Sequence, residues 1–119
     1  MYAASVITGC GPAFVSMFIE ALADGGVMTG LTRAQAQSFA VETLIGTATL
    51  IAKTGKHPEK LKDEVCSPGG STIAGVVSLE KNGFRNAAVI LSNNSTFKNL
   101  NSFLFAFLNA NVNLNGRTD

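Results

Sequence analysis

The chain has 119 residues, of which 46% are apolar and 14% charged, and its formal net charge is +1. This length supports one domain with a modest core, and the apolar fraction excludes a disordered chain. The near-neutral charge gives no reason to propose nucleic acid or a membrane as a partner. Because so small a domain cannot bury this much apolar surface by itself, we expect another chain to cover part of it.

The chain holds two cysteines, Cys10 and Cys66, and a single histidine, His57. These residues are too few for a disulfide framework or a zinc motif, so we expect packed, reduced thiols and no metal site. No secretory signal is visible, and the purely apolar runs are much shorter than the roughly 20 residues of a membrane-spanning helix. We therefore expect a cytoplasmic protein.

Helical patterns begin after a short apolar lead with strand-like residues, residues 1–8. A turn at residues 9–12 ends in proline, which favours a helix start. Apolar side chains then recur at helical spacing from Ala13 to Asp24, and the Gly25-Gly26 pair is expected to loosen that helix at its end. The pattern predicts a first helix that is covered on two sides.

A second helix has a capping box at its start, where Thr32 and Gln35 stand three residues apart. We expect it to reach about Thr54 and to stop at Gly55. Large and small residues alternate along it, which is typical of the central helix of a packed bundle. Gly46 costs about 1 kcal/mol relative to alanine in a helix interior, so close packing there is the expected compensation.

Three shorter helices follow, at residues 58–65, 71–81 and 85–91. His57 stands before Pro58, where an N-cap role is favoured over a catalytic one. In the fourth helix, Ile73, Val76 and Val77 are expected to face the core. Residues 92–119 form an atypical Asn-rich tail, which we interpret as weakly ordered around a short apolar stretch at 103–108. The sequence thus predicts an all-α helical bundle over residues 9–91, with no strand.

The turn between the third and fourth helices, residues 66–70, allows two interpretations. The first is an ordinary turn followed by a Ser or Thr N-cap. In the second, the glycines let the backbone approach a ligand, and the amides at the helix N-terminus bind a small anion such as a carboxylate.

Residues 58–80, which include Leu61, Val65, Gly69-Gly70, Thr72 and Gly75, resemble the signature of pyrroline-5-carboxylate reductase. Further stretches resemble the same family at residues 9–14, 20–27, 54–58 and 82–85. The resemblance covers about residues 9–88 and implies the C-terminal dimerisation domain of that family. It weakens after Ala88, and the Gly-rich turn of a nucleotide-binding domain is absent from this sequence.

The resemblance implies a site for a cyclic imino acid, pyrroline-5-carboxylate, that is reduced to proline with NADP or NAD as the cofactor. Thr72 matches the substrate-contacting threonine and is the implied catalytic residue. Gly11 and Pro12 would face the nicotinamide, and no metal is implied. The implied substrate-binding residues are Val65, Ser67, Gly69, Gly70, Ser71 and Thr72.

The family's domains interlock as homodimers that can assemble further into a ring, so we expect a homo-oligomer. We expect the chain to supply the substrate loop and the dimer interface, and to be inactive alone because it lacks the nucleotide-binding domain. The alternative is a non-catalytic helical oligomerisation module. Ligand binding separates the two, since only the first requires affinity for proline.

Overall fold

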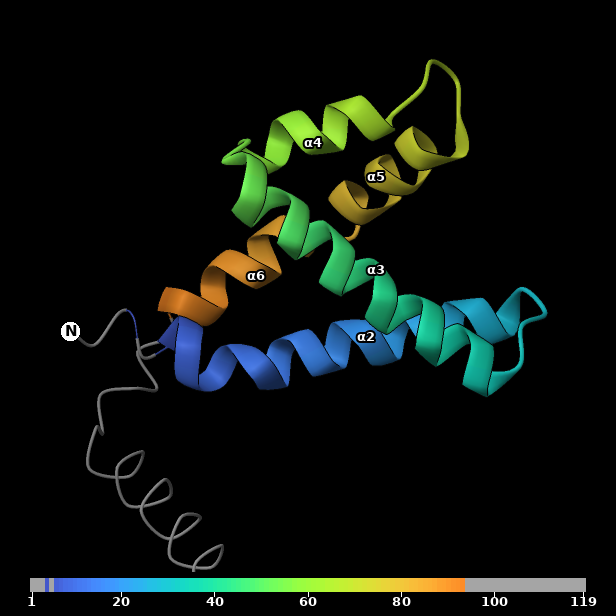
Figure 1. Cartoon of the computed structure of the whole chain (residues 1–119), viewed down its shortest axis with the longest axis horizontal. Coiled ribbons are helices and arrows are strands. Elements are labelled where there is room, and N and C mark those ends of the chain that lie inside the picture. The colour runs from blue at the N-terminus through green and yellow to red at the C-terminus, as the bar shows by residue number, and fades with distance from the viewer. Residues whose placement is uncertain (1–3, 5, 94–119) are drawn as a thin grey trace, which may run out of the picture. The chain divides into compact units, whose positions relative to one another are not determined.

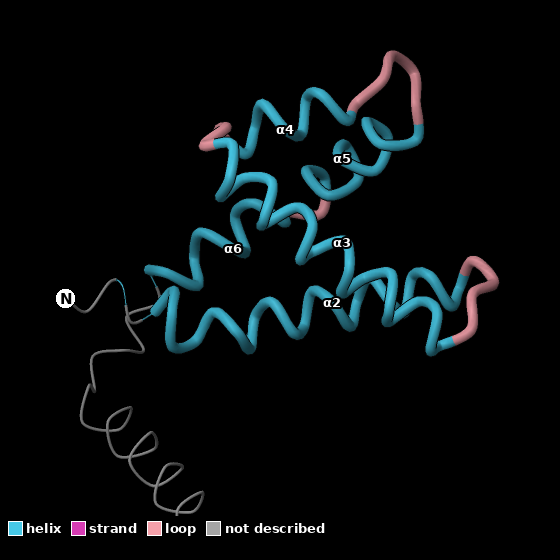
Figure 2. Tube along the Cα trace, in the orientation of Figure 1, coloured by secondary structure: helices cyan, strands magenta, loops and turns pink. Residues whose placement is uncertain are grey.

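A computed structural model describes residue 4 and residues 6–93 of the chain (Figure 1). The described residues are helical with short connections, and no strand occurs among them (Figure 2), which confirms the all-α prediction. The chain divides into two units, residues 1–84 and 85–119. The elements are η1 (Val6–Cys10), α2 (Gly11–Met28), α3 (Arg33–Thr54), α4 (Pro58–Val65), α5 (Ser71–Lys81) and α6 (Phe84–Asn93).

The expected strand-like lead and glycine turn are wrong in the described part, where η1 is a π-helix that runs directly into α2. Cys10 has a helical backbone, with φ −92° and ψ −27°. Pro12 explains the wider turn, because it has no N–H to donate and its ring crowds the preceding turn of an α-helix. The predicted weakly ordered tail from residue 92 starts inside α6, and its larger part, from residue 94, lies outside the described residues.

The helices α2 and α3 form a hairpin in which α3 packs back along α2 (Figure 1). The pair buries three small side chains, Ala23, Ala36 and Ala40. A Cβ at Gly26 would lie 3.0 Å from the Cβ of Ala36, so glycine is what permits this approach. The expectation that the glycine pair loosens the helix is therefore wrong, since α2 continues to Met28 and uses Gly26 for packing.

The predicted start and end of α3 are confirmed. The Thr32 hydroxyl accepts from the Gln35 amide at 3.2 Å, and the Gln35 side chain accepts from the Thr32 amide at 3.2 Å. Gly55 ends the helix with φ +65°, and its amide donates to the carbonyl oxygen of Ile51 at 3.0 Å. Such left-handed C-caps favour glycine, because it has no Cβ to clash with the backbone.

The expected burial of the apolar faces is wrong within the single chain. The fourth predicted helix, α5, buries no residue, and Ile73 and Val77 are 38% and 45% exposed. Around Gly46 in α3 there is open space, not the close packing expected of a central helix. A domain that leaves large apolar side chains exposed on several helices has the surface of one half of a shared core.

One stretch, Val6–Met28, is long and apolar enough to cross a membrane, with a mean hydropathy of 1.6 and 6% of the window buried. Glu20 and Asp24 interrupt this stretch, so it contains no purely apolar run of that length. Helices that are covered by a second chain meet the same criteria, because they too expose apolar surface in one copy. Length and hydropathy alone therefore do not assign this helix to a membrane.

Candidate functional site

The third helix, α4, is placed by local signals at its N-terminus. His57 is the N-cap, and its Nδ1 accepts from the Glu59 amide at 3.2 Å. Pro58 follows in the first turn, where its fixed φ and missing N–H carry no penalty. The predicted capping role of His57 is thus confirmed, and α4 begins and ends at the expected residues.

The turn after α4 is closed by hydrogen bonds within its own backbone. The Cys66 amide donates to the carbonyl oxygen of Asp63 at 3.1 Å, and the Gly70 amide donates to that of Ser67 at 3.1 Å. The bond from Gly70 to Ser67 closes a four-residue turn whose two central residues are Pro68 and Gly69, and Gly69 has φ +67°. Proline followed by a residue of positive φ is the pattern of a type II β-turn.

The helix that follows this turn has no side-chain cap. Its N-cap is Gly70, with φ −80° and ψ 171°, and no side chain accepts from the first turn. The Ala74 amide reaches the carbonyl oxygen of Gly70 at 3.5 Å. Within the described residues, the amides of Ser71, Thr72 and Ile73 have no acceptor.

The turn itself is an ordinary hydrogen-bonded one, but the Ser or Thr N-cap of the first interpretation is wrong, because Gly70 is the N-cap of α5. Glycine has no side-chain oxygen that could accept from the first helical amides, so three donors are left at the positive end of the helix dipole. Such an arrangement is suited to an anion, which would supply the missing acceptors.

Two of the predicted substrate residues, Val65 and Thr72, line one open groove of about 560 Å³. The groove lies against α3 and α4, and its surface is mainly apolar. Its lining residues are Glu42, Thr43, Gly46, Thr47, Leu50, Ile51, Pro58, Leu61, Lys62, Val65 and Thr72. Thr72 thus stands both in the uncapped first turn of α5 and at an apolar groove.

The other predicted site residues lie outside this groove. Ser67, Gly69 and Gly70 form the turn itself, and Ser71 is the first residue of α5. The amide of Gly70 is already used in the turn, whereas those of Ser71 and Thr72 have no acceptor within the described residues.

Gly11 and Pro12 stand at the start of α2. In the described part of the chain, no hydrogen bond joins them to the turn. A Cβ at Gly11 would meet nothing within 4 Å, so this position presents bare backbone to open space.

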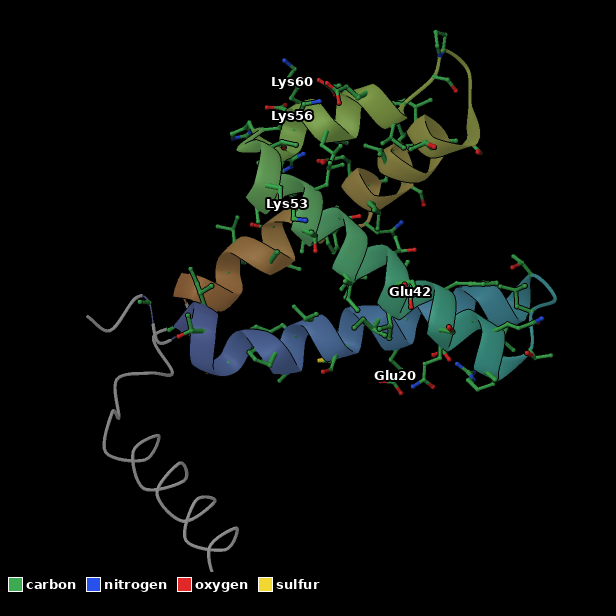
Figure 3. The ribbon with its side chains drawn as sticks, in the orientation of Figure 1. Glu20, Glu42, Lys53, Lys56 and Lys60 are labelled. Atoms are coloured by element: carbon green, nitrogen blue, oxygen red, sulfur yellow. The ribbon has the colours of Figure 1, made fainter. Side chains whose placement is uncertain are left out.

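Sequence reasoning missed the contribution of α3 to the groove. Glu42, which Figure 3 labels on α3, lines it together with Thr43, Gly46 and Thr47. These residues recur at spacings of three and four, which places them along one helical face. That periodicity was the available signal, but a face that contains threonine and glycine is not distinguished by hydropathy from a solvent-facing one.

No group of three or more His, Cys, Asp or Glu side chains that could hold a metal ion occurs among the described residues. The two cysteines are unpaired thiols of intermediate exposure.

Comparison with known proteins bears on the whole helical region. Residues 1–99 match a family model described as pyrroline-5-carboxylate reductase dimerisation. A pyrroline-5-carboxylate reductase of Synechocystis sp. is 57% identical over 89 residues, which cover 75% of this chain and 33% of that protein. The Escherichia coli protein of the same name is 55% identical over 84 residues, covering 71% of this chain and 31% of its own length.

Solved structures give the same result. The crystal structure of a Plasmodium falciparum pyrroline carboxylate reductase with NADP bound superposes with a TM-score of 0.76 at 38% identity, over 81% of this chain and 37% of that one. A Streptococcus pyogenes 1-pyrroline-5-carboxylate reductase gives a TM-score of 0.77 at 32% identity, with the same coverage. The chain spans about a third of the length of the curated relatives that it matches. The match over residues 1–99, the all-helical fold and the agreement with solved structures establish that this chain belongs to the pyrroline-5-carboxylate reductase dimerisation family.

Proposed function

We propose that this chain is the substrate-binding and dimerisation part of a pyrroline-5-carboxylate reductase. The observation that carries the proposal is the first turn of α5, where Gly70 caps the helix without a side chain. The carboxylate of the cyclic imino acid would accept from the amides of Ser71 and Thr72. Gly69 and Gly70 keep the turn compact and free of side chains, and Ser67 and Val65 border the site.

The reduction adds a hydride to the carbon of the C=N bond, and the π electrons move to the ring nitrogen, which ends as an amine. The nitrogen therefore needs a hydrogen-bonding partner throughout the reaction. In the proposal the hydroxyl group of Thr72 is that partner, which makes Thr72 the catalytic residue. Its position at the apolar groove supports this role, since the methylene groups of the ring require an apolar wall.

The cofactor NADP or NAD would supply the hydride when bound. Gly11 and Pro12 fit the nicotinamide side, because bare backbone and a flat proline ring can approach an aromatic ring closely. The described residues contain no Gly-rich phosphate-binding turn between a strand and a helix, so they do not fit the phosphate part of the nucleotide. We therefore propose that the chain by itself does not turn over substrate.

Ligand titration tests the proposal directly. L-proline added to the 119-residue chain should shift the amide NMR signals of Ser71 and Thr72. Pyrrolidine, which has the same ring without the carboxylate, should not. Absence of any shift at these amides with L-proline would overturn the site.

A matched pair of variants tests the hydroxyl group. Thr72→Val removes it and retains the shape, while Thr72→Ser keeps it. Loss of a hydrogen bond to a charged nitrogen costs about 1.5–3 kcal/mol, so Thr72→Val should weaken L-proline binding roughly 10- to 150-fold. Ser78→Ala, which removes a hydroxyl from the far end of the same helix, is the control and should bind like the natural chain.

A second candidate is a non-catalytic helical oligomerisation module. The exposed apolar side chains on α3 and α5 support the module and the enzyme part equally, since both functions require association. Association without affinity for L-proline would support the module and contradict the enzyme part.

A further inference from the structure

The helix that leads into the turn, α4, has little intrinsic stability. It has eight residues and buries none of them. Isolated helices below about 12–15 residues are marginal in water. Its N-terminus is capped by His57, and the residue that follows the helix, its C-cap Cys66, has an extended backbone with φ −87° and ψ 97°. The last turn of α4 is therefore the part that most needs support, and the turn at 66–70 starts from it.

A two-oxygen ion pair spans α4 from one end to the other. The Lys56 Nζ lies 3.0 Å from Oε1 and 2.9 Å from Oε2 of Glu64. Lys56 belongs to the connection before α4, at the corner that Figure 3 labels, while Glu64 is the penultimate residue of the helix. The pair therefore fixes the last turn of α4 to the chain that enters it.

The placement of charge also suits the helix dipole. A lysine ammonium held beside the C-terminal turn is attracted to the partial negative charge of its carbonyl groups. Lys62, the basic residue within the last turn of α4, contacts Asp63 at 3.3 Å, so it does not compete for Glu64. Lys56 is therefore the cation that secures this end of α4.

We propose that Lys56 and Glu64 are positioning residues for the turn at 66–70. If the last turn of α4 unwinds, the connection to α5 becomes longer and samples more conformations. Ligand binding then has to order these residues, which lowers the affinity. The part of this inference that concerns affinity rests on the proposed function, but the part that concerns the order of the turn does not.

The expected effect is small. The two side chains are 38% and 43% exposed, so solvent screens their attraction. Surface ion pairs of this kind correspond to changes of roughly 1.5- to 5-fold in an equilibrium. The amides of Cys66 and Gly70 report on it, because each donates to a carbonyl oxygen that loosens when α4 unwinds.

The experiment measures amide hydrogen exchange in the full chain without ligand. Lys56→Met and Glu64→Gln should each raise the exchange rate of Cys66 and Gly70 by roughly 1.5- to 5-fold. The double variant Lys56→Glu/Glu64→Lys, which rebuilds the pair with exchanged charges, should restore the slower rate. The control is Arg33→Met, which breaks the Asp24–Arg33 ion pair of 2.6 Å in the α2–α3 hairpin and should leave both amides unchanged.

Rates that stay unchanged in the single variants would overturn the inference. So would faster exchange that the charge exchange fails to reverse, because the effect would then come from the substitutions and not from the pair. In a parallel titration, the two single variants should bind L-proline more weakly than the natural chain, and the charge-exchanged double variant should recover the affinity. If the natural chain binds no L-proline, the proposed function fails, while the exchange rates still decide the role of the ion pair.

Discussion

The backbone amide of Gly70 donates to the carbonyl oxygen of Ser67 at 3.1 Å, and the Ser67 hydroxyl fills the space that a Cβ at residue 70 would need. Gly70 is at the same time the N-cap of α5. This one residue therefore closes the turn, accommodates Ser67 and leaves the first amides of the helix uncapped. The two successive glycines before α5 therefore have different causes: Gly70 leaves room for the Ser67 side chain, and Gly69 has a positive φ of +67°.

The substitution Gly70→Ala should weaken L-proline binding by about 1 kcal/mol, or roughly fivefold, because the Ser67 side chain must move to make room for the new Cβ. Titration calorimetry measures the change. Ser67→Ala/Gly70→Ala removes the clashing oxygen and should recover part of the affinity. Equal affinity in Gly70→Ala and the natural chain would contradict the steric argument.

Gly69 has φ +67°, which costs about 1–2 kcal/mol for residues with a Cβ. Gly69→Ala should therefore destabilise the turn by about that amount, whereas Gly69→Asn should cost less, since asparagine tolerates this region better. Hydrogen exchange of the Gly70 amide should be slowest in the natural chain, faster in Gly69→Asn and fastest in Gly69→Ala. If the alanine variant exchanges as slowly as the natural chain, the turn is not of the proposed type.

His57→Ala should destabilise the start of α4, because the Glu59 amide loses its acceptor. The loss of an N-cap costs about 0.5–2 kcal/mol. The readout is exchange of the Lys60 and Leu61 amides, which donate to the His57 carbonyl oxygen at 3.0 and 3.3 Å. His57→Asn supplies another capping oxygen and is the matched control, expected to stay close to the natural chain.

The thermal unfolding midpoint should rise with the concentration of the chain. Only three alanines are buried in the described part of the single chain, so most of the apolar stabilisation has to come from association. Circular dichroism melts over a hundredfold range of concentration measure this. A midpoint that does not depend on concentration would show that the single chain is stable by itself.

The exposed apolar face of α3 should contribute to that association. Ile45 is 58% exposed, and Ile45→Lys should lower the unfolding midpoint and shift the chain to smaller species in sedimentation equilibrium, because a charge then enters an apolar contact. Lys53→Ala on the same helix is the control and should leave the assembly unchanged. An Ile45→Lys chain that associates normally would remove this face from the interface.

Local features of this protein could be predicted from the sequence because their causes act within a few residues. The capping box of Thr32 and Gln35, the N-cap at His57 and the left-handed Gly55 each depend on neighbours three or four positions away. The bounds of α4 and α5 followed for the same reason. The site motif was also visible, since its residues are continuous in the chain.

The surroundings of the predicted helices were decided only by the tertiary structure. It showed that Gly70, and not a serine or threonine, is the N-cap of α5, and it brought Thr72 to a groove lined by Gly46 and its neighbours in α3. It also left Ile73 and Val77 exposed where hydropathy alone predicted a core. Hydropathy records that a side chain favours burial, but the surface that buries it is set by contacts between distant segments and between chains.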